Sequence, residues 1–531
     1  MKNRNIILSA VLLFCSLVSC DKFLDRMPDN RATIDTPEKV RALLTSGYPR
    51  TDYMLVTEFM SDNVDDYGKN NPYTDRFIDQ VYAWEDVTET DNEDPETIWE
   101  NSYIAISCAN EALQAIENMG GVKETGMYAE MAEALLCRAY NHFILVNVFC
   151  MQYNAETAAS DLGIPYMTKP ETTLNPQYER GTVAEVYEKI DADIQNALPY
   201  VSEEYYSVPK YHFNIKAAYA FAARFYLYYE KYEKSLEYAN RVLGSTPATM
   251  LRDWKYQSKM TQDYEPIVEH YIDASLNCNL LLMTANSKMG LAFGPYRVYS
   301  KYSHGAYLAE EETGIALTSL WGGTNNTYYM NMKVYSATNL DKTIFWKLPY
   351  LFEYTDPVAR IGYHKTVYPA FSADMTLLER AEANIILNNF DDAVADMNLW
   401  VKNIAENPST LTQERIVSYF SNEDYTTWKL GTLKKHLHPA ASVKMGEEGG
   451  VKENMLQCIL ALKRVESLGQ GLRWFDIKRY DIEIERRSIN PAGFPEKQLG
   501  VLSKRDCRRA VQIPPKVRDA NMQPNPRETV N

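Results

Sequence analysis

Apolar residues recur every three or four positions along several stretches of the chain, and this spacing predicts amphipathic helices. The clearest run follows Thr182 without a break, at Val183, Val186, Tyr187, Ile190, Ile194, Ala197 and Leu198. Thr182 and Glu185 have the spacing of a capping box, which satisfies free N–H groups where a helix begins. Thr97 and Glu100 have the same spacing, so we expect a helix to begin there and end at Gly120.

The same periodicity predicts further helices at 124–149, 215–230, 233–243, 375–387, 390–405 and 455–468. Two pairs of consecutive helices, 215–230 with 233–243 and 375–387 with 390–405, have the same spacing of small and aromatic residues. Ala223 precedes Tyr232 by nine residues, Ala381 precedes Phe390 by nine, and a small residue follows each aromatic residue three positions later. Small residues let two helices approach closely, and this pattern resembles the tetratricopeptide repeat. We therefore predict a mostly α fold with a tetratricopeptide-like α-solenoid core.

Residues 246–373 interrupt the helical pattern. They are rich in Tyr, Gly, Asn and Thr and contain strand-like runs at 279–284, 331–336, 344–351 and 364–368. We expect a large, irregular, partly β insertion there, which is where recognition loops are commonly carried. The predicted organisation is a signal segment at 1–19, a body at 20–531 with helical repeats at about 97–245 and 375–470, and a C-terminal segment at 471–531.

Two other stretches have a distinctive composition. Residues 84–96 include seven acidic residues and should be solvated, while the glycines of 443–453 suggest a mobile loop.

The first twenty residues read as a secretory signal. A short basic start precedes a 13-residue apolar run, and Leu17-Val18-Ser19-Cys20 follows. That ending looks like a bacterial lipobox, in which Cys20 is acylated and becomes the mature N-terminus. The apolar run is short for a membrane span, which needs about 20 residues. We therefore expect a lipid anchor at Cys20 and a water-exposed body behind it.

Charge and cysteine content argue against nucleic-acid binding and against a cysteine-based metal site. The formal net charge is −16 and the chain has no basic run, so nucleic-acid binding is not expected. None of the cysteines forms a CxxC pair or a zinc spacing. Most should be small buried apolar residues, and a Cys108–Cys137 disulfide across a helical hairpin stays open.

Motifs for catalysis are missing from the sequence. It contains no HExxH, GxSxG, GxGxxG or Walker pattern, and no pair of carboxylates stands out as a glycosidase dyad. Residues 63–68 have a faint calcium-loop character without the full spacing. We therefore predict a protein that is not an enzyme and that has no cofactor and no metal site.

The aromatic content points to ligand binding. The chain has 39 Tyr and 8 Trp, and rings of this kind can stack on flat apolar faces of a ligand. In the insertion, the candidate ligand contacts are Tyr296, Trp321, Asn325, Asn326, Tyr328 and Tyr329. The two asparagines would donate and accept hydrogen bonds. The alternative is that these aromatic residues fill the contact between the insertion and the helical repeats.

A second candidate set lies nearer the N-terminus and comprises Asp65, Tyr67, Tyr73 and Trp84.

Several segments in this order resemble the SusD/RagB family of nutrient-binding outer-membrane lipoproteins of Bacteroidota. They are Cys20-Asp-Lys-Phe-Leu-Asp25, Gly47-Tyr48, Glu133-Ala-Leu-Leu-Cys-Arg-Ala139, Gly163-Ile-Pro165, Arg180-Gly-Thr-Val183, Gly471-Leu-Arg-Trp-Phe-Asp-Ile-Lys-Arg479 and Ala510-Val-Gln-Ile-Pro514. One departure is Gln470, where the family usually has a glutamate before the glycine.

The resemblance implies a lipid-anchored outer-membrane protein that faces the cell exterior. It would capture oligosaccharides and deliver them to a SusC-like TonB-dependent transporter. The same role with oligopeptide ligands is one alternative. An alternative of another class is a helical-repeat scaffold at the membrane that binds no ligand, although a scaffold has no need of an aromatic insertion.

Overall fold

The computed structural model describes residues 33–527 except 69–70, 72, 174–175, 298, 323–326 and 338–339. The predicted signal segment and Cys20 therefore lie outside the described residues, as do Asn325 and Asn326. In the part of the chain that is described, no helix is both long and apolar enough to cross a bilayer.

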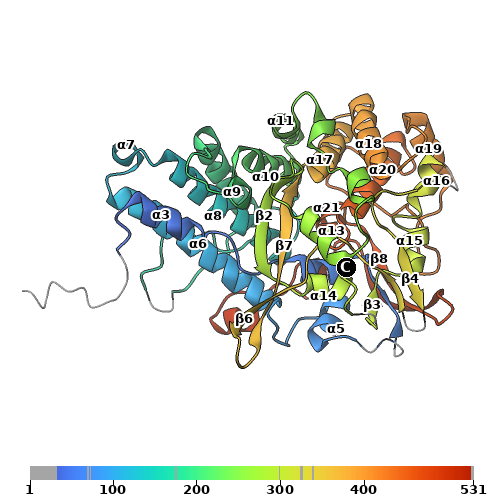
Figure 1. Cartoon of the computed structure of the whole chain (residues 1–531), viewed down its shortest axis with the longest axis horizontal. Helices are drawn as coiled ribbons and strands as arrows, with labels where there is room; N and C mark the ends of the chain where they lie inside the picture. Colours follow the sequence, from blue (N-terminus) through green and yellow to red (C-terminus); the bar gives the residue numbers. More distant parts are fainter. Residues whose placement is uncertain are drawn as a thin grey trace, which may run out of the picture.

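Helices dominate the N-terminal half. They are α3 (Pro37–Leu44), α4 (Met54–Met60), α5 (Arg76–Tyr82), α6 (Pro95–Asn118), α7 (Val122–Thr125), α8 (Tyr128–Phe149), α9 (Val183–Ala197), α10 (Ile215–Tyr228) and α11 (Tyr232–Leu243). The long helices pack against their neighbours in sequence, α6 on α8, α8 on α9 and α10 on α11. They follow one another from left to right in Figure 1.

A second helical group contains the C-terminal repeats. It comprises α17 (Ala373–Ile386), α18 (Phe390–Ile404), α19 (Gln413–Asn422), α20 (Val451–Glu466) and α21 (Arg473–Arg479). The two groups join where α11 packs on α17. The predicted helix crossings are confirmed, because Ala223 and Ala381 are completely buried and the hydroxyl of Ser235 donates to the carbonyl of Ala223 at 2.8 Å. The predicted fold class is confirmed.

Between these groups, short helices and two small sheets occupy the middle of the chain. The helices are α12 (Trp254–Gln257), α13 (Tyr264–Tyr271), α14 (Met289–Phe293), α15 (Ala306–Glu311) and α16 (Leu317–Trp321). Strands β2 (Asn279–Asn286), β7 (Ile361–Ser372) and β6 (Leu351–Asp356) form one antiparallel sheet in that order, and β4 (Val334–Ala337) pairs with β5 (Leu340–Thr343).

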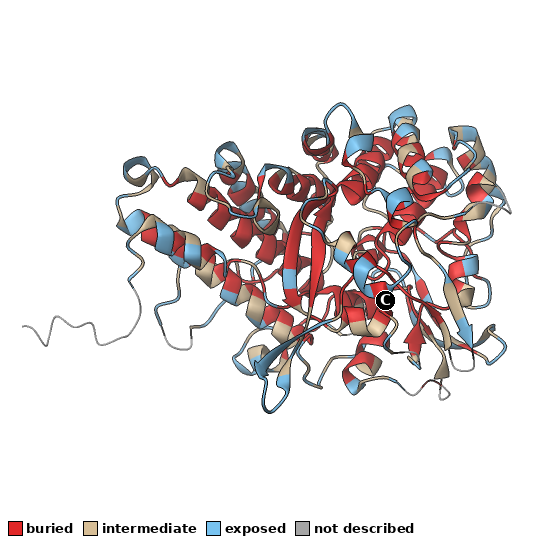
Figure 2. Ribbon diagram, in the orientation of Figure 1, coloured by how far each residue is buried: buried red, intermediate tan, exposed pale blue. Residues whose placement is uncertain are grey.

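The third sheet joins distant parts of the chain. Its order is β3 (Tyr302–Ser303), β1 (Asp65–Asp66), β8 (Ile484–Ile489) and β9 (Pro495–Leu502). Residues from the N-terminal, middle and C-terminal regions therefore share one set of hydrogen bonds. Figure 2 shows that the buried residues continue from the helical repeats into β2 and β7, while the far end of the β6–β7 hairpin is exposed.

Local sequence signals predicted one helix start correctly and misplaced another. The capping box of Thr182 and Glu185 is formed in both directions. The box predicted at Thr97 is wrong, because α6 begins two residues earlier at Pro95 and Asp94 caps it by accepting the N–H of Thr97 at 2.6 Å. Proline at the first helical position favours this earlier start.

The helix predicted at 124–149 is divided in the structure. The short helix α7 ends at Gly126, whose φ of 74° lies in the left-handed region, and α8 begins at Tyr128. A residue with this backbone conformation ends a helix, and glycine adopts it without steric cost.

Two other local expectations are also wrong, and one open question is answered. The run 344–351 is not a strand until Leu351; Ile344, Phe345 and Trp346 are buried by packing. The acidic stretch 84–96 is not fully solvated, because Glu93 is buried and accepts hydrogen bonds from Ser287 and Lys288. All six described cysteines are free thiols, so Cys108 and Cys137 are not linked.

Candidate functional site

The structure corrects the expected exposure of Trp321. Its side chain is 0% exposed, beneath the contact between α16 and α19. The ring of Tyr328 packs edge-on against it at 6.2 Å, and the Tyr328 hydroxyl donates to the carbonyl of Gly314 at 2.6 Å. These two residues join the insertion to the helical core, so Trp321 offers no surface for stacking on a ligand in this structure.

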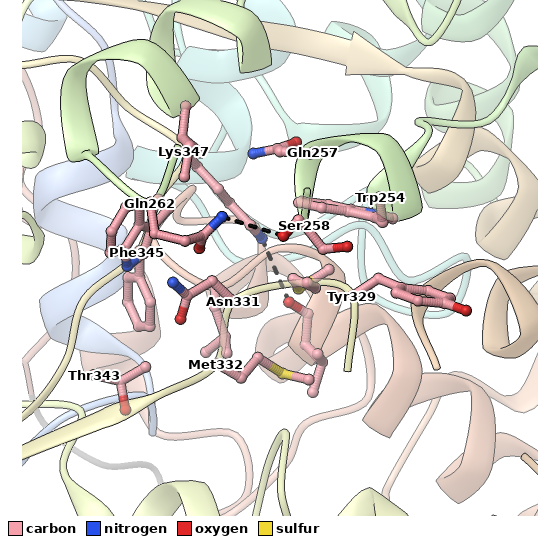
Figure 3. A pocket seen from close by; sticks show the side chains of 15 residues that line it. Trp254, Gln257, Ser258, Gln262, Tyr329, Asn331, Met332, Thr343, Phe345 and Lys347 are labelled. Atoms are coloured by element: carbon pink, nitrogen blue, oxygen red, sulfur yellow. Dashed lines mark hydrogen bonds between the residues drawn. The ribbon is translucent and has the colours of Figure 1, made fainter. Parts of the chain in front are cut away.

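Tyr329 lies beside a narrow crevice that is lined by Trp254, Phe345 and Trp346 (Figure 3). The crevice has a volume of about 30 Å³. This corresponds to about two water molecules, so a sugar ring does not fit. The indole N–H groups of Trp254 and Trp346 have no hydrogen-bond partner among the described residues. At one end, burial lowers the pKa of Lys347 to about 8 while its ammonium donates to the carbonyl of Glu466.

The second candidate set divides into buried and exposed members. Trp84 is buried; its indole N–H donates to the carbonyl of Met60 at 2.9 Å, and the Arg486 guanidinium lies 4.5 Å from its ring. Asp65 is also buried and forms an ion pair with Arg487 at 3.0 Å. Both side chains are therefore part of the core. The prediction that Trp84 is accessible to a ligand is wrong.

Tyr73 and Tyr296 are at the surface, as ligand contacts require, with 53% and 40% of each side chain exposed. The backbone of Tyr73 pairs with the strand-like segment at 299–301, and the Arg297 guanidinium lies 5.3 Å from the Tyr73 ring. The Tyr296 hydroxyl donates to Glu265 at 2.7 Å. Partial burial and this hydrogen bond raise the pKa of Tyr296 to about 12, so the hydroxyl stays a donor at neutral pH.

Ring contacts continue from Tyr296 onto the β6–β7 hairpin. Neighbouring ring centroids are 4.9 Å apart for Tyr296 and Tyr350, 5.2 Å for Tyr350 and His364, 5.2 Å for His364 and Phe352, and 4.8 Å for Phe352 and Tyr354. We call these five residues the aromatic face. Such edge and tilted contacts hold the rings in place while leaving their outer surfaces available.

Strand alternation explains why these rings gather on one side. Tyr350, Phe352 and Tyr354 are two residues apart, and Phe352 is paired in register with His364. Gly362 lies opposite Tyr354, where a Cβ would come within 2.7 Å of the Phe352 ring. The missing side chain therefore makes room for the backbone carbonyl of Glu353 and for the ring. Tyr354, 54% exposed, lies near the end of the hairpin that projects below the body in Figure 1.

A buried lysine holds the loop at the base of this face. The Lys342 ammonium donates to the carbonyls of Ala292 and Arg297, both at 2.6 Å. Burial and the nearby Arg297 lower the pKa of Lys342 to about 7. Because both carbonyls flank Tyr296, this lysine fixes the backbone from which that ring extends.

Charged groups beside Tyr73 form a compact network. Asp79 pairs with Lys301 at 2.9 Å and accepts the hydroxyl of Tyr302 at 2.6 Å. Burial alone would raise the pKa of Asp79, but these hydrogen bonds hold it below its usual value. Among the described residues, no group of His, Cys, Asp or Glu side chains is arranged to hold a metal ion.

Comparison with known proteins shows which family the chain resembles. Residues 22–227 match the SusD-like family described as "Starch-binding associating with outer membrane". The SusD-like protein P2 of Formosa agariphila is 25% identical over 455 residues, which cover 82% of this chain and 81% of the relative. The chain is therefore similar to proteins of the SusD/RagB family.

Solved structures agree with this SusD-like fold. A SusD superfamily protein from Bacteroides thetaiotaomicron superposes with a TM-score of 0.62 at 18% identity, covering 93% of this chain and all of that chain. A SusD-like carbohydrate binding protein from Bacteroides vulgatus gives 0.58 at 14% identity, covering 91% and 96%. At these identities the likeness establishes the fold.

Sequence reasoning missed most of this SusD-like chain's aromatic face. Of its five members it named Tyr296; Tyr350, Phe352, Tyr354 and His364 escaped attention. The alternation of aromatic residues at 350, 352 and 354 was a usable signal, because period-two spacing places side chains on one face of a strand. Only Tyr350 lay within the strand-like run predicted at 344–351, which stops before Phe352 and Tyr354.

Proposed function

We propose that this chain is a lipid-anchored outer-membrane protein that captures oligosaccharides on its aromatic face and delivers them to a SusC-like TonB-dependent transporter. The observation that carries the proposal is the continuous row of surface rings from Tyr296 to Tyr354. The family description and the carbohydrate-binding structural relative support the same ligand class.

The chemistry of the face suits saccharides. Pyranose rings present flat C–H surfaces that pack on aromatic rings, while their hydroxyls need hydrogen-bond partners at the edges. The Tyr296 hydroxyl with Glu265, and the partly exposed His364, supply such partners. An extended row of rings matches several consecutive sugar units better than one.

The test compares two faces of one hairpin. Phe352→Ala with Tyr354→Ala removes two rings of the aromatic face, whereas Tyr363→Ala removes an equally accessible ring whose register places it on the opposite face. Burying a Phe side chain contributes about 1.5–3 kcal/mol, so the double variant should bind at least about tenfold more weakly. Binding is measured by calorimetry with a glycan selected from an array.

The results separate the parts of the proposal. Unchanged affinity in the double variant would remove the aromatic face from the site. Peptide binding with no glycan bound on the array would replace the ligand class and keep the family role. Conversion of a bound glycan into products would contradict a purely binding function.

Anchoring is tested separately. We expect Cys20→Ala to leave the protein in the soluble fraction, because the acyl chains that hold it at the membrane can no longer be attached. A Cys20→Ala protein that still fractionates with outer membranes, beside a Cys15→Ala control that does so normally, would overturn the lipid anchor. Co-purification of the wild-type protein with a TonB-dependent barrel tests the transporter.

A further inference from the structure

An open recess of about 400 Å³ lies away from the aromatic face, among four segments distant in sequence. The segments are the loop after α8, residues 437–446 before α20, the C-terminal end of α21, and the turn after β9. Ligand pockets commonly occupy roughly 300–1,000 Å³, so the recess is larger than an isolated inorganic ion requires.

Unpaired positive charge lines this recess. Lys444, Lys504 and Arg505 are exposed, and none forms an ion pair with any residue that the structure describes. Among the acidic residues that line the recess, Glu156 alone is likewise exposed and without an ion pair to any described residue. The recess is therefore locally positive on a chain whose net charge is −16. Exposed cations in a concave site attract anions over a distance of about 10 Å at moderate salt.

The other charged groups of the recess are already neutralised. Arg479 pairs with Glu382 at 2.6 Å and with Asp476 at 3.1 Å. Asp481 pairs with Arg509 at 2.9 Å, and its two carboxylate oxygens accept the backbone N–H of Arg505 at 3.0 Å. These contacts fix the backbone of the turn that carries Lys504 and Arg505. The unpaired side chains of these two residues therefore extend from a fixed position.

The backbone conformation at the recess is informative. Lys444, Asp481 and Arg505 have φ of 48°, 46° and 54°, in the left-handed region that glycine adopts most readily. Three charged residues occupy such positions around one recess. Keeping a side chain at a position where glycine would be less strained is typical of functional sites.

The walls supply contacts for an organic molecule. The ring of Tyr153, held by Tyr187 and Tyr229 at 4.9 Å each, lies beside the amides of Gln152 and Asn154. The Gln152 Oε1 atom accepts no hydrogen bond from the described residues. These groups suit a hydroxylated molecule that carries a negative charge. The ring would pack against its apolar face, the amides would hydrogen-bond to its hydroxyls, and the cations would bind its negative group.

We propose that this recess is a second binding site for acidic saccharides, whose carboxylate or sulfate group would be bound by Lys444, Lys504 and Arg505. The site is separate from the aromatic face and does not depend on it. It would give the protein a preference for acidic over neutral saccharides.

The experiment uses the full mature chain and calorimetry at low and at moderate salt. The probes are a galacturonic acid trimer, galactose 6-sulfate, a neutral galactose trimer and triglutamate. The recess variant combines Lys444→Gln, Lys504→Gln and Arg505→Gln, which remove charge and keep a Cβ at the left-handed positions. The matched control combines Lys123→Gln, Lys259→Gln and Lys402→Gln, three exposed lysines outside the recess, so both variants have the same net charge.

We expect at least one of the two acidic saccharides to bind the wild type, the control and the aromatic-face double variant, and to bind the recess variant about tenfold more weakly. Added salt should weaken this binding. Absence of binding by both acidic saccharides, equal binding by the neutral trimer, equal or tighter binding by triglutamate, or unchanged affinity in the recess variant would overturn the proposal. Loss of acidic-saccharide binding in the aromatic-face variant alone would place these ligands on the aromatic face and overturn the recess proposal, whereas loss of neutral-glycan binding in that variant would support the proposed function.

Discussion

Aromatic residues of similar type serve opposite purposes in this protein. Trp321 is sealed between helices, whereas Tyr354 is largely exposed on a hairpin. Neither local sequence nor residue type separates the two, because burial depends on which distant elements cover a side chain.

At the same scale, Asp52 makes stability depend on pH. Its carboxylate accepts the N–H of Met54 at 2.7 Å, and burial raises its pKa from 3.8 to about 7. A raised carboxyl pKa means that the folded protein binds more protons than the unfolded chain between about pH 4 and 7, so Asp52 lowers stability as pH rises through that window. Asp52→Asn keeps an oxygen that can accept the N–H of Met54 and removes this ionisation.

We therefore compare the free energy of unfolding of Asp52→Asn with that of the wild type at two pH values. The difference, variant minus wild type, should be about 1–3 kcal/mol more favourable to the variant at pH 7.5 than at pH 4.5. Glu93 should add to the effect, because burial and then the Asp52 charge raise its own pKa. Urea denaturation of both proteins at both pH values gives these free energies of unfolding. The exposed Asp263→Asn is the control; a difference that does not change with pH would refute the assignment.

At the scale of elements, helix starts depend on which side chain reaches the free N–H groups. Both Thr97 and Thr182 precede a glutamate by three residues, yet only Thr182 forms a capping box. At α6, Asp94 and Pro95 provide a stronger start, so the helix begins earlier. The competing signal was visible in the sequence.

This difference leads to a prediction about stability. Thr182→Ala and Asp94→Ala should each lower the free energy of unfolding by about 1 kcal/mol, because each leaves a backbone N–H of a first helical turn without its partner. Chemical denaturation monitored by circular dichroism gives the values. The exposed Thr172→Ala should cost less than about 0.5 kcal/mol. An Asp94→Ala protein as stable as the wild type would show that α6 needs no cap.

At the scale of the whole molecule, a buried ionic cluster holds the three chain regions together. Glu312, from the middle of the chain, pairs with Lys435, with Arg464 at 3.2 Å and with Arg487 at 2.6 Å. Arg464 also contacts Asp62 near the N-terminus at 3.4 Å. The small sheet of β3, β1, β8 and β9 joins the same regions, so charge pairing and strand pairing act on one junction.

Removing the central carboxylate should be costly. Glu312→Gln leaves buried cations without their partner, and breaking a buried pair in this way costs about 3–5 kcal/mol. Burial would raise the pKa of Glu312, but Lys435, Arg487 and Arg464 hold it well below its usual value. Its stabilisation is therefore present above about pH 4.5 and is lost as pH falls through the lowered pKa.

The measurement is equilibrium unfolding at pH 7, repeated at pH 4. Glu310→Gln, on the exposed side of the same segment, should change stability by less than about 0.5 kcal/mol. If Glu312→Gln were as stable as Glu310→Gln at pH 7, the cluster would not hold the regions together.

The sequence by itself determined the helices, their pairing and the mostly α class, because three-four periodicity, caps and small residues at crossings act over a few neighbouring positions. Ala223 and Ala381 were identified correctly for this reason. Only the tertiary structure decided which aromatic residues reach solvent and which cations stay unpaired. Those properties depend on segments apart in sequence that meet in the fold, such as α16 and α19 over Trp321 or the four segments around Arg505, and local periodicity does not record these contacts.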